Sequence, residues 1–230
     1  MEREYLARPP SPVTRLLHRW IALERDYRNP AVDRAFVRAI VEQPPGAFCL
    51  SVGGGPARIS PRLVNLNLGP YPNVDVVGTA YLLPFRTGSV DAVFCEAVLE
   101  HLEFPDAAVA EMFRVLRPGG QLYASTPFLQ AFHGYPSHYQ NFTRVGHERL
   151  FVRAGFSLID SGACVGPVRA LTDLVAAMLA ILLPGRAGLL AWYLWQILAR
   201  LLRPLDRLAR RRPRADFIAS STFVHCRKPV

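Results

Sequence analysis

Two histidines and a tyrosine lie close together in the second half of the chain, at His133, His138 and Tyr139. The pKa of a histidine side chain is ordinarily near neutrality, so an imidazole can take a proton from an oxygen or nitrogen nucleophile at pH 7. We therefore expect His133 or His138 to act as a general base, with Tyr139 orienting the group that loses the proton. The alternative is that these side chains only shape a pocket.

Three consecutive glycines, Gly53, Gly54 and Gly55, directly follow an apolar run that is typical of a buried strand. Without a Cβ atom, glycine lets the backbone approach a ligand closely, and ligands of open α/β sheets bind beyond the carboxyl ends of the strands. The glycines therefore predict a ligand-binding loop, although a plain tight turn has the same composition. The spacing of GGGPA does not match GxGxxG, which disfavours a hydride-transferring dehydrogenase.

Short apolar runs alternate with helical segments from residue 47 onward, which predicts a parallel sheet covered on both faces. Thr143 is expected to cap a helix, Glu100 and His101 are interpreted as a polar pair at a helix end, and Cys95 as a core thiol. The expected strands are 47–52, 62–68, 74–78, 90–97, 121–128, 156–165 and 217–228, and the expected helices 106–116 and 147–155, with a turn at 118–120.

A series of motifs in this region resembles the class I S-adenosylmethionine-dependent methyltransferases that act on small molecules and lipids. The motifs are FCLSVGGGPA, LLPF followed by GSVDAVFCEAVLEHL, EMFRVLRPGG and LYASTPF, in the family's order between about residues 47 and 160. The resemblance implies an α/β fold with a Rossmann-like, doubly wound, mostly parallel seven-stranded sheet whose last strand is antiparallel. It also implies S-adenosylmethionine as cofactor and methyl transfer to a small, lipidic or amphiphilic acceptor.

The same resemblance assigns cofactor-binding roles to individual residues. The glycine loop would line the methionine end of the cofactor, and a residue after the second strand would hold the ribose hydroxyls. A pair after the third strand would lie beside the adenine, and a pair after the fourth would border the sulfonium. In that order, the residues are Gly53, Gly54 and Gly55; Asn67; Thr79 and Ala80; and Glu96 and Ala97.

The chain departs from the family at three of its polar positions. Family members commonly have an acid where this chain has Ser51, Asn67 and Thr79. A charge-assisted hydrogen bond contributes roughly 1.5–3 kcal/mol, against ~1 kcal/mol for a neutral one. Replacing two or three of them would weaken cofactor binding by ~10- to 1000-fold. The alternative function is therefore a catalytically silent, methyltransferase-like module that binds a membrane or a partner protein.

Two segments lie outside the expected methyltransferase domain, which takes residues 47–166 and 215–230. Residues 1–46 are expected to form a helical lead-in, and residues 167–214 an apolar and basic helical hairpin inserted before the last strand. Because neither apolar half is long enough to span a bilayer, we expect the hairpin to turn at Pro184-Gly185.

The second half of the hairpin has two faces of different character. Flanking aromatic residues, a basic stripe and an apolar face are typical of a helix that lies in a membrane interface. We therefore expect an anionic membrane surface to bind through residues 187–214, with a homo-oligomer interface or a lid over an apolar substrate as alternatives. The polar stripe is Gln196, Arg200, Arg203, Arg207 and Arg210, and the apolar face is Leu194, Ile197, Leu198, Leu201, Leu205 and Leu208.

The charge balance is basic, with 27 lysines and arginines against 18 acids and a net charge of +9. Such a surface attracts nucleic acid, anionic lipid or anionic substrates, but no recognition motif favours nucleic acid. The four cysteines lie far apart, without the Cys/His spacing of a zinc site, so no metal is expected. Reduced, buried cysteines and the lack of a leader sequence predict a cytoplasmic location, peripheral at the inner membrane face.

Overall fold

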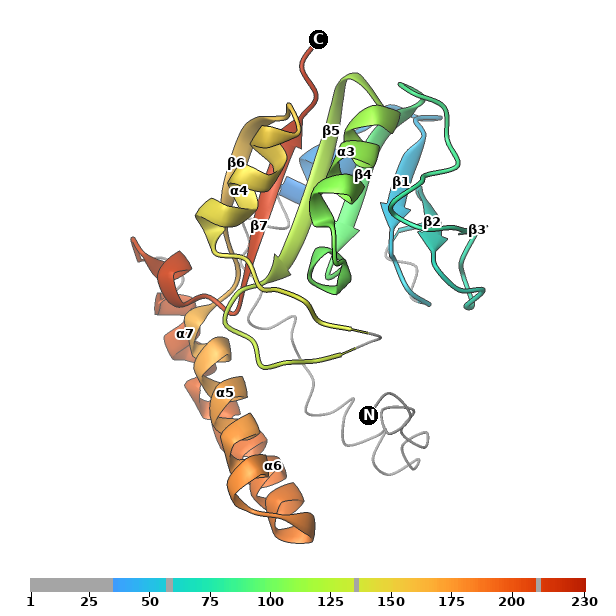
Figure 1. The fold of residues 1–230 in the computed structure, drawn as a ribbon. Coiled ribbons are helices and arrows are strands. Elements are labelled where there is room, and N and C mark those ends of the chain that lie inside the picture. The colour runs from blue at the N-terminus through green and yellow to red at the C-terminus, as the bar shows by residue number, and fades with distance from the viewer. Residues whose placement is uncertain (1–34, 57–59, 135–136, 210–211) are drawn as a thin grey trace.

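The computed structural model describes residues 35–56, 60–134, 137–209 and 212–230 of the chain (Figure 1). Most of the expected N-terminal lead-in, including its first helix, lies outside these residues. Its described part forms a short helical segment that ends in the π-helical turn η2 (Val37–Val41). Buried residues of this segment, among them Ala39 and Ile40, pack with one face of the central sheet.

A seven-stranded sheet forms the centre of the protein, in the order β3-β2-β1-β4-β5-β7-β6. Neighbouring strands from β3 to β5 pair in parallel, whereas β7 runs antiparallel to both β5 and β6 (Figure 1). This arrangement confirms the predicted Rossmann-like sheet and its antiparallel last strand. The strands are β1 (Cys49–Val52), β2 (Leu63–Asn67), β3 (Val76–Val77), β4 (Val90–Glu96), β5 (Leu116–Pro127), β6 (Ser157–Val165) and β7 (Ser221–Arg227).

Side chains from successive residues of a strand point to opposite faces of the sheet, and β4 shows how the two faces are filled. Cys95 packs in the cluster that includes Met112 of helix α3 (Pro105–Val115) and Phe151 of helix α4 (Arg144–Arg153). Phe94 packs on the other face, where its ring stacks on Tyr123 of β5 with 5.5 Å between the centroids. Both faces are therefore covered, as the strand–helix alternation predicts.

The helix cap at α4 is confirmed, and the Pro-Gly-Gly segment at 118–120, expected to be a turn, forms a bulge within strand β5. The Thr143 hydroxyl accepts a hydrogen bond from the Gly146 N–H at 3.1 Å. Strand β5 instead runs through Pro118–Gly120 with a shift in its register against β4. Gly119 takes a left-handed φ of 75° in this bulge, and its N–H donates to the Lys228 carbonyl at 2.9 Å.

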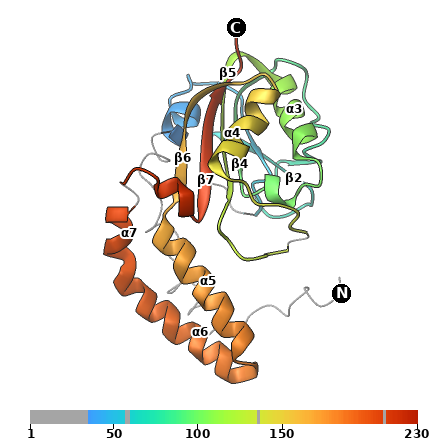
Figure 2. The ribbon, with the colours of Figure 1, turned by 60° about the vertical axis from the view of Figure 1, so that its left-hand side comes forward.

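A pair of helices projects from the sheet domain as a long hairpin (Figure 1, Figure 2). Helix α5 (Pro167–Leu182) is followed by α6 (Gly185–Ala199), the 3-10 turn η4 (Arg200–Leu202) and helix α7 (Arg203–Ala209). The short 3-10 turn η5 (Ala215–Ile218) then leads into β7. The predicted hairpin and its turn at Pro184-Gly185 are confirmed, and Gly185 takes a left-handed φ of 66° there.

The hairpin buries Gln196 and Thr172 between its helices and exposes its leucines. Gln196 is only 6% exposed, and the Trp195 indole N–H donates to the Thr172 carbonyl at 2.8 Å, which joins α6 to α5. In contrast, Leu201 is 73% exposed, and each of the six residues expected on the apolar face is more than half exposed. Among the described residues, no helix is long and apolar enough to cross a membrane.

Candidate active site

A cavity of about 600 Å³ lies at the carboxyl ends of β1, β2 and β4. This is the edge of an open α/β sheet where ligands bind, and the volume is within the range of small-molecule sites, roughly 300–1,000 Å³. Its lining combines the glycine loop, the segments that follow β2, β3 and β4, and one tyrosine from the segment after β5. The lining residues are Val52, Gly53, Gly55, Pro56, Leu66, Asn67, Leu68, Tyr71, Gly78, Thr79, Ala80, Tyr81, Ala97, Val98, His101, Leu102, Glu103 and Tyr139.

The glycine loop is held against its neighbours by close contacts that only glycine allows. Gly53 has a φ of 72°, and a Cβ atom there would lie 2.4 Å from a methyl carbon of Val98. At Gly54, a Cβ atom would lie 2.3 Å from Oδ1 of Asn65. Gly53 and Gly55 line the cavity, whereas Gly54 packs away from it. Two of the three predicted glycines thus line the cavity, and the third is packed against β2.

Asn65 is a buried residue that supports the glycine loop, and no sequence motif indicates this role. Its amide nitrogen donates to the Gly55 carbonyl at 2.9 Å and to the Asn73 carbonyl at 2.8 Å. These bonds join the glycine loop to the segment that follows β2. An asparagine in the middle of a strand gives no signal of this role, since its partners are set only by the fold.

Four of the other predicted cofactor-binding residues line the cavity. Two of them use their side chains locally: the Asn67 amide oxygen accepts from the Leu68 N–H at 2.8 Å, and the Thr79 hydroxyl accepts from the Tyr81 N–H at 3.2 Å. Among the described residues, no hydrogen bond is donated by the Asn67 amide or the Thr79 hydroxyl, so both can donate to a ligand in the cavity. Ala80 and Ala97 complete the set of four.

Glu96 is not part of the described lining. It accepts a hydrogen bond from the Ser125 hydroxyl at 3.2 Å, on the neighbouring strand β5. An acid does reach the cavity from another position, Glu103, which follows the short turn η3 (Leu99–His101). No sequence pattern marks Glu103, whereas the three positions where the family commonly has an acid are Ser51, Asn67 and Thr79.

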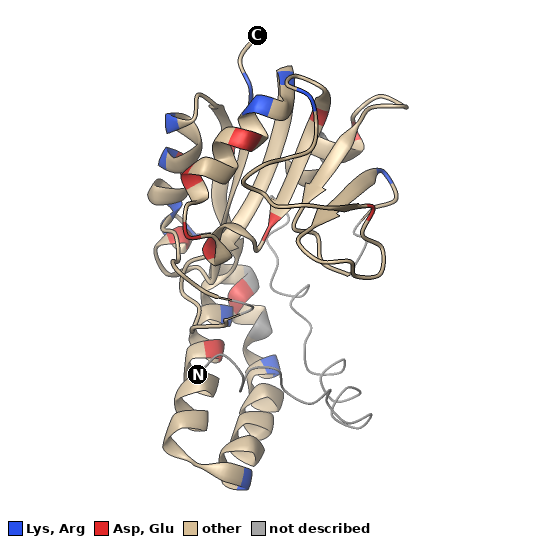
Figure 3. Ribbon diagram, turned by 45° about the vertical axis from the view of Figure 1, so that its right-hand side comes forward, with Lys and Arg blue, Asp and Glu red and all other residues tan. Residues whose placement is uncertain are grey.

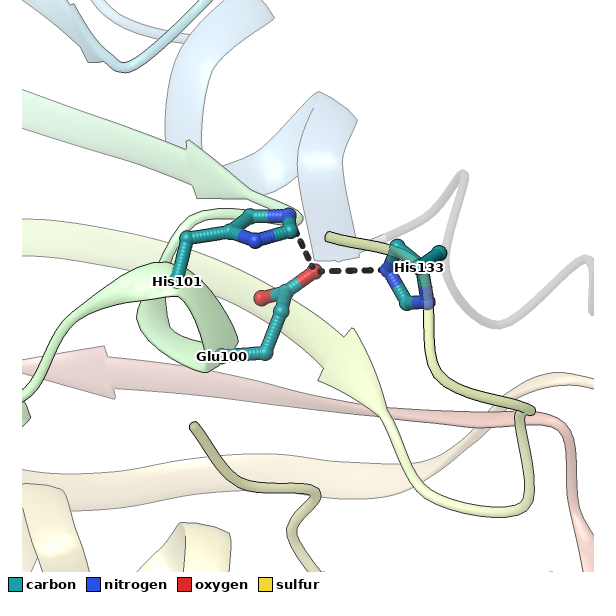
Figure 4. Close-up of side chains that lie close together, drawn as sticks. All are labelled: Glu100, His101 and His133. Atoms are coloured by element: carbon teal, nitrogen blue, oxygen red, sulfur yellow. Dashed lines mark ion pairs between the residues drawn. The ribbon is translucent and has the colours of Figure 1, made fainter. Parts of the chain in front are cut away.

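Glu100, His101 and His133 come together at the edge of the cavity (Figure 4). The Glu100 side chain is fully buried, and its Oε1 lies 3.7 Å from Nε2 of His101 and 3.9 Å from Nε2 of His133. Burial raises the pKa of the Glu100 carboxyl, while the two histidines and the Thr126 hydroxyl act in the opposite direction. We name these three residues the Glu-His cluster. Only its His101 lines the cavity.

The ring nitrogens of His138 are both engaged by neighbouring groups. Its Nδ1 accepts from the His133 N–H at 3.2 Å, so Nε2 carries the proton and donates to the Asn141 side-chain oxygen at 2.7 Å. Tyr139 follows it and lines the cavity, with its backbone N–H donating to the Glu100 carbonyl at 2.8 Å. The segment after β5 is thereby fixed against η3, and Tyr139 shares the cavity with His101.

The four cysteines are buried, and none of them forms a disulfide bond. Burial raises the pKa of Cys226 to about 12 and places the pKa of Cys95 well above its ordinary value. A thiol acts as a nucleophile through its thiolate, so neither residue is ionised near neutral pH. This agrees with the interpretation of Cys95 as a core thiol.

The strand order, the glycine loop after β1 and the cavity at the sheet's carboxyl edge define the class I S-adenosylmethionine-dependent methyltransferase fold, whose cofactor is S-adenosylmethionine. Residues 57–124 match the model of the methyltransferase-domain family. The chain therefore carries a methyltransferase domain of this class. The cavity also fits the cofactor in volume and in lining. The backbone of Gly53 and Gly55 borders it without side chains, and the Asn67 and Thr79 side chains can donate hydrogen bonds to a ligand.

The chain is similar to a curated methyltransferase in sequence and to solved structures in fold. A probable S-adenosylmethionine-dependent methyltransferase of Mycolicibacterium smegmatis is 37% identical over 98 residues, which is 40% of this chain and 38% of the relative. The phosphoethanolamine N-methyltransferase 2 of Haemonchus contortus shares the fold with a TM-score of 0.58 at 17% identity, over 100% of this chain and 60% of that chain. The [4+2]-cyclase SpnF has a TM-score of 0.56 at 18% identity, over 87% of this chain and 80% of the cyclase chain. The chain spans less than half the length of the first curated relatives it matches.

Proposed function

We propose that the protein transfers a methyl group from S-adenosylmethionine to a small, amphiphilic or lipidic acceptor at a membrane surface. The observation that supports this acceptor class is the outward-facing leucine side of the hairpin. Strand β6 runs parallel to β5, since both are antiparallel to β7, so α5 leaves the sheet at the edge where the cavity lies. A hairpin in contact with lipid would hold that edge close to a membrane-bound acceptor.

The residues of the cavity can hold the cofactor in a defined orientation. In this proposal, the backbone of Gly53 and Gly55 borders the methionine end, and Asn67 and Thr79 offer hydrogen bonds to the ribose and to the adenine side. S-adenosylmethionine supplies an electrophilic methyl group on a cationic sulfonium. Because the transfer is a direct displacement, much of the acceleration comes from aligning the acceptor with that methyl group.

We assign activation of the acceptor to the Glu-His cluster and its orientation to Tyr139. His101 and Tyr139 both line the cavity. His133 contacts His101 outside the lining, with 5.4 Å between the ring centroids. His138 has both nitrogens engaged, so in this proposal it supports the segment and takes no proton. Of the two histidines proposed from the sequence, His133 is therefore the one retained in the activating group.

Calorimetric titration with S-adenosylhomocysteine tests the cofactor half of the proposal. We expect binding in the micromolar range, because the donors at Asn67 and Thr79 replace charge-assisted bonds with neutral ones and weaken binding without abolishing it.

For the acceptor half, protein and radiolabelled S-adenosylmethionine are incubated with a lipid extract and with an aqueous metabolite extract of the same cells. Label that enters the lipid fraction supports an amphiphilic acceptor, and label found only in the aqueous fraction contradicts it.

The catalytically silent module is the second candidate function. It is favoured by the missing acids at Ser51, Asn67 and Thr79 together with the exposed hairpin. An absence of S-adenosylhomocysteine binding at millimolar concentration would favour this module and contradict the methyltransferase.

A further inference from the structure

We propose that Glu100, His101 and His133 form a binding site for a divalent transition-metal ion of the zinc type at the edge of the cavity. The three ligand atoms all lie within 4.8 Å of one another. They come from two places in the sequence, the turn η3 and the segment after β5, and their side chains converge on one point (Figure 4).

Hydrogen bonds on the far side of each imidazole set which nitrogen faces the cluster. Nδ1 of His101 lies 2.5 Å from the Ser137 carbonyl oxygen, and Nδ1 of His133 lies 3.0 Å from the Ala131 carbonyl oxygen. A carbonyl oxygen only accepts hydrogen bonds, so both Nδ1 atoms carry the hydrogen. In the neutral rings, Nε2 is then an acceptor, and both Nε2 atoms face the Glu100 carboxylate.

The Glu100 carboxylate is buried and incompletely satisfied. Its Oε2 accepts from the Thr126 hydroxyl at 3.2 Å, whereas its Oε1, among the described residues, has no hydrogen-bond partner. The distances of 3.7 and 3.9 Å to the imidazoles are too long for a direct hydrogen bond. Three electron-pair donors therefore surround one point, and a cation at that point would satisfy all of them.

The ligand set selects the kind of cation. Two imidazole nitrogens and one carboxylate oxygen suit zinc, cobalt or iron(II), whereas magnesium and calcium prefer oxygen ligands alone. Imidazoles that bind a metal typically donate their other N–H to a backbone carbonyl, as both rings do in this cluster. Ligand atoms that share a metal at ~2.0–2.2 Å lie roughly 3–3.5 Å apart. His133, whose side chain is 42% exposed, would have to move inward by about an ångström.

Three protein ligands leave coordination positions open, and His101 lines the cavity. An acceptor with a hydroxyl group can occupy such a position, where a metal ion lowers the pKa of the bound oxygen and lets its proton pass to water. This role rests on the proposed function. Binding of the metal itself does not.

Titration of the untagged, full-length, metal-free protein with Co²⁺ tests the site. We expect one ion per chain with micromolar or tighter affinity, a visible d–d spectrum of a low-coordinate site, and displacement by Zn²⁺ but not by excess Mg²⁺. His133→Ala should weaken binding at least tenfold, and Glu100→Gln should do the same if circular dichroism shows that it folds. His225→Gln is the matched control, because it removes an imidazole on β7 whose Nε2 is bonded to Gln121 and which has no place in the cluster. Its affinity should stay within about twofold.

Two results would overturn the metal site: no stoichiometric binding at millimolar Co²⁺, or equal affinity in the wild-type protein and His133→Ala. Titration of the same samples with S-adenosylhomocysteine separates this proposal from the proposed function. Metal binding without cofactor binding would keep the site and reject the methyltransferase. Cofactor binding without metal binding would reject the metal site and keep the methyltransferase.

Discussion

Gly53→Ala is expected to weaken S-adenosylhomocysteine binding by about 30-fold to several-thousand-fold. A residue with a side chain costs ~1–2 kcal/mol at a left-handed φ, and Gly53 has a φ of 72°. Its new Cβ would also lie 2.4 Å from a methyl carbon of Val98, and overpacking of that kind costs roughly 1–3 kcal/mol. The free protein can relieve this strain by moving the loop away. Ligand binding must then bring the loop back, so the strain is measured as lost affinity.

Gly55→Ala is the matched control for this experiment. Gly55 has a similar φ of 61°, but nothing lies within 4 Å of the position that a Cβ would take. We therefore expect only the backbone cost, an affinity loss of roughly 5- to 30-fold. The double variant Gly53→Ala/Val98→Ala removes the clashing methyl groups and should regain affinity to about the Gly55→Ala level. Unchanged binding by Gly53→Ala in calorimetry would show that this loop does not border the cofactor.

The fold could be predicted because its signals are local and repeated along the chain. Alternating strands and helices, an ordered motif series and a capping threonine at Thr143 each depend on residues close in sequence. The bulge that takes the place of a separate turn at 118–120 could not be predicted, for the opposite reason. Pro-Gly-Gly is a local turn signal, but pairing of Gly119 with Lys228, more than a hundred residues away, incorporates the segment into strand β5 as a bulge.

Only those residues of the candidate site that belong to the family's sequence motifs could be predicted. The glycine loop, Asn67, Thr79, Ala80 and Ala97 follow strands of recognised order, and all but Gly54 of that group line the cavity. The approach of His133 to Glu100 depends on how the segment after β5 returns across η3, and a spacing of 33 residues contains no sign of it. The Cys/His spacing of a zinc site does not mark this cluster, since one of its members is a carboxylate and its histidines come from different segments.

The hairpin shows a further limit of sequence patterns. Periodicity separates a polar stripe from an apolar face on α6, but it does not say which face is buried. The structure buries Gln196 and exposes the leucines, the reverse of a helix packed on a water-soluble core. Between Asp173 and Arg200 the only charged residue is Arg186, and Figure 3 shows the outer part of the hairpin almost free of charge. Exposed apolar side chains gathered on one face are typical of an interaction surface.

Replacing three of the exposed leucines of the hairpin is expected to abolish binding to anionic liposomes. Leu190, Leu194 and Leu201 are 60%, 58% and 73% exposed, so changing them to glutamine leaves the packing of the hairpin intact. Burying a leucine side chain in an apolar medium contributes roughly 1.5–3 kcal/mol. The triple variant should therefore lose about 4–9 kcal/mol, at least a 1000-fold loss in partitioning. Co-sedimentation with vesicles that contain phosphatidylglycerol measures the effect.

A charge-neutral control separates insertion of the hairpin from general surface stickiness. Phe104, Val145 and Val152 are 61%, 54% and 51% exposed on the sheet domain, and their replacement by glutamine should leave sedimentation unchanged. At 1.5 Å per residue, the 15 residues of α6 extend about 22 Å. That length reaches through one leaflet but not across a hydrocarbon core of ~30 Å. If the wild-type protein stays in the supernatant and elutes as a dimer that the leucine variant dissociates, a second copy of the chain covers the leucines, and the membrane proposal fails.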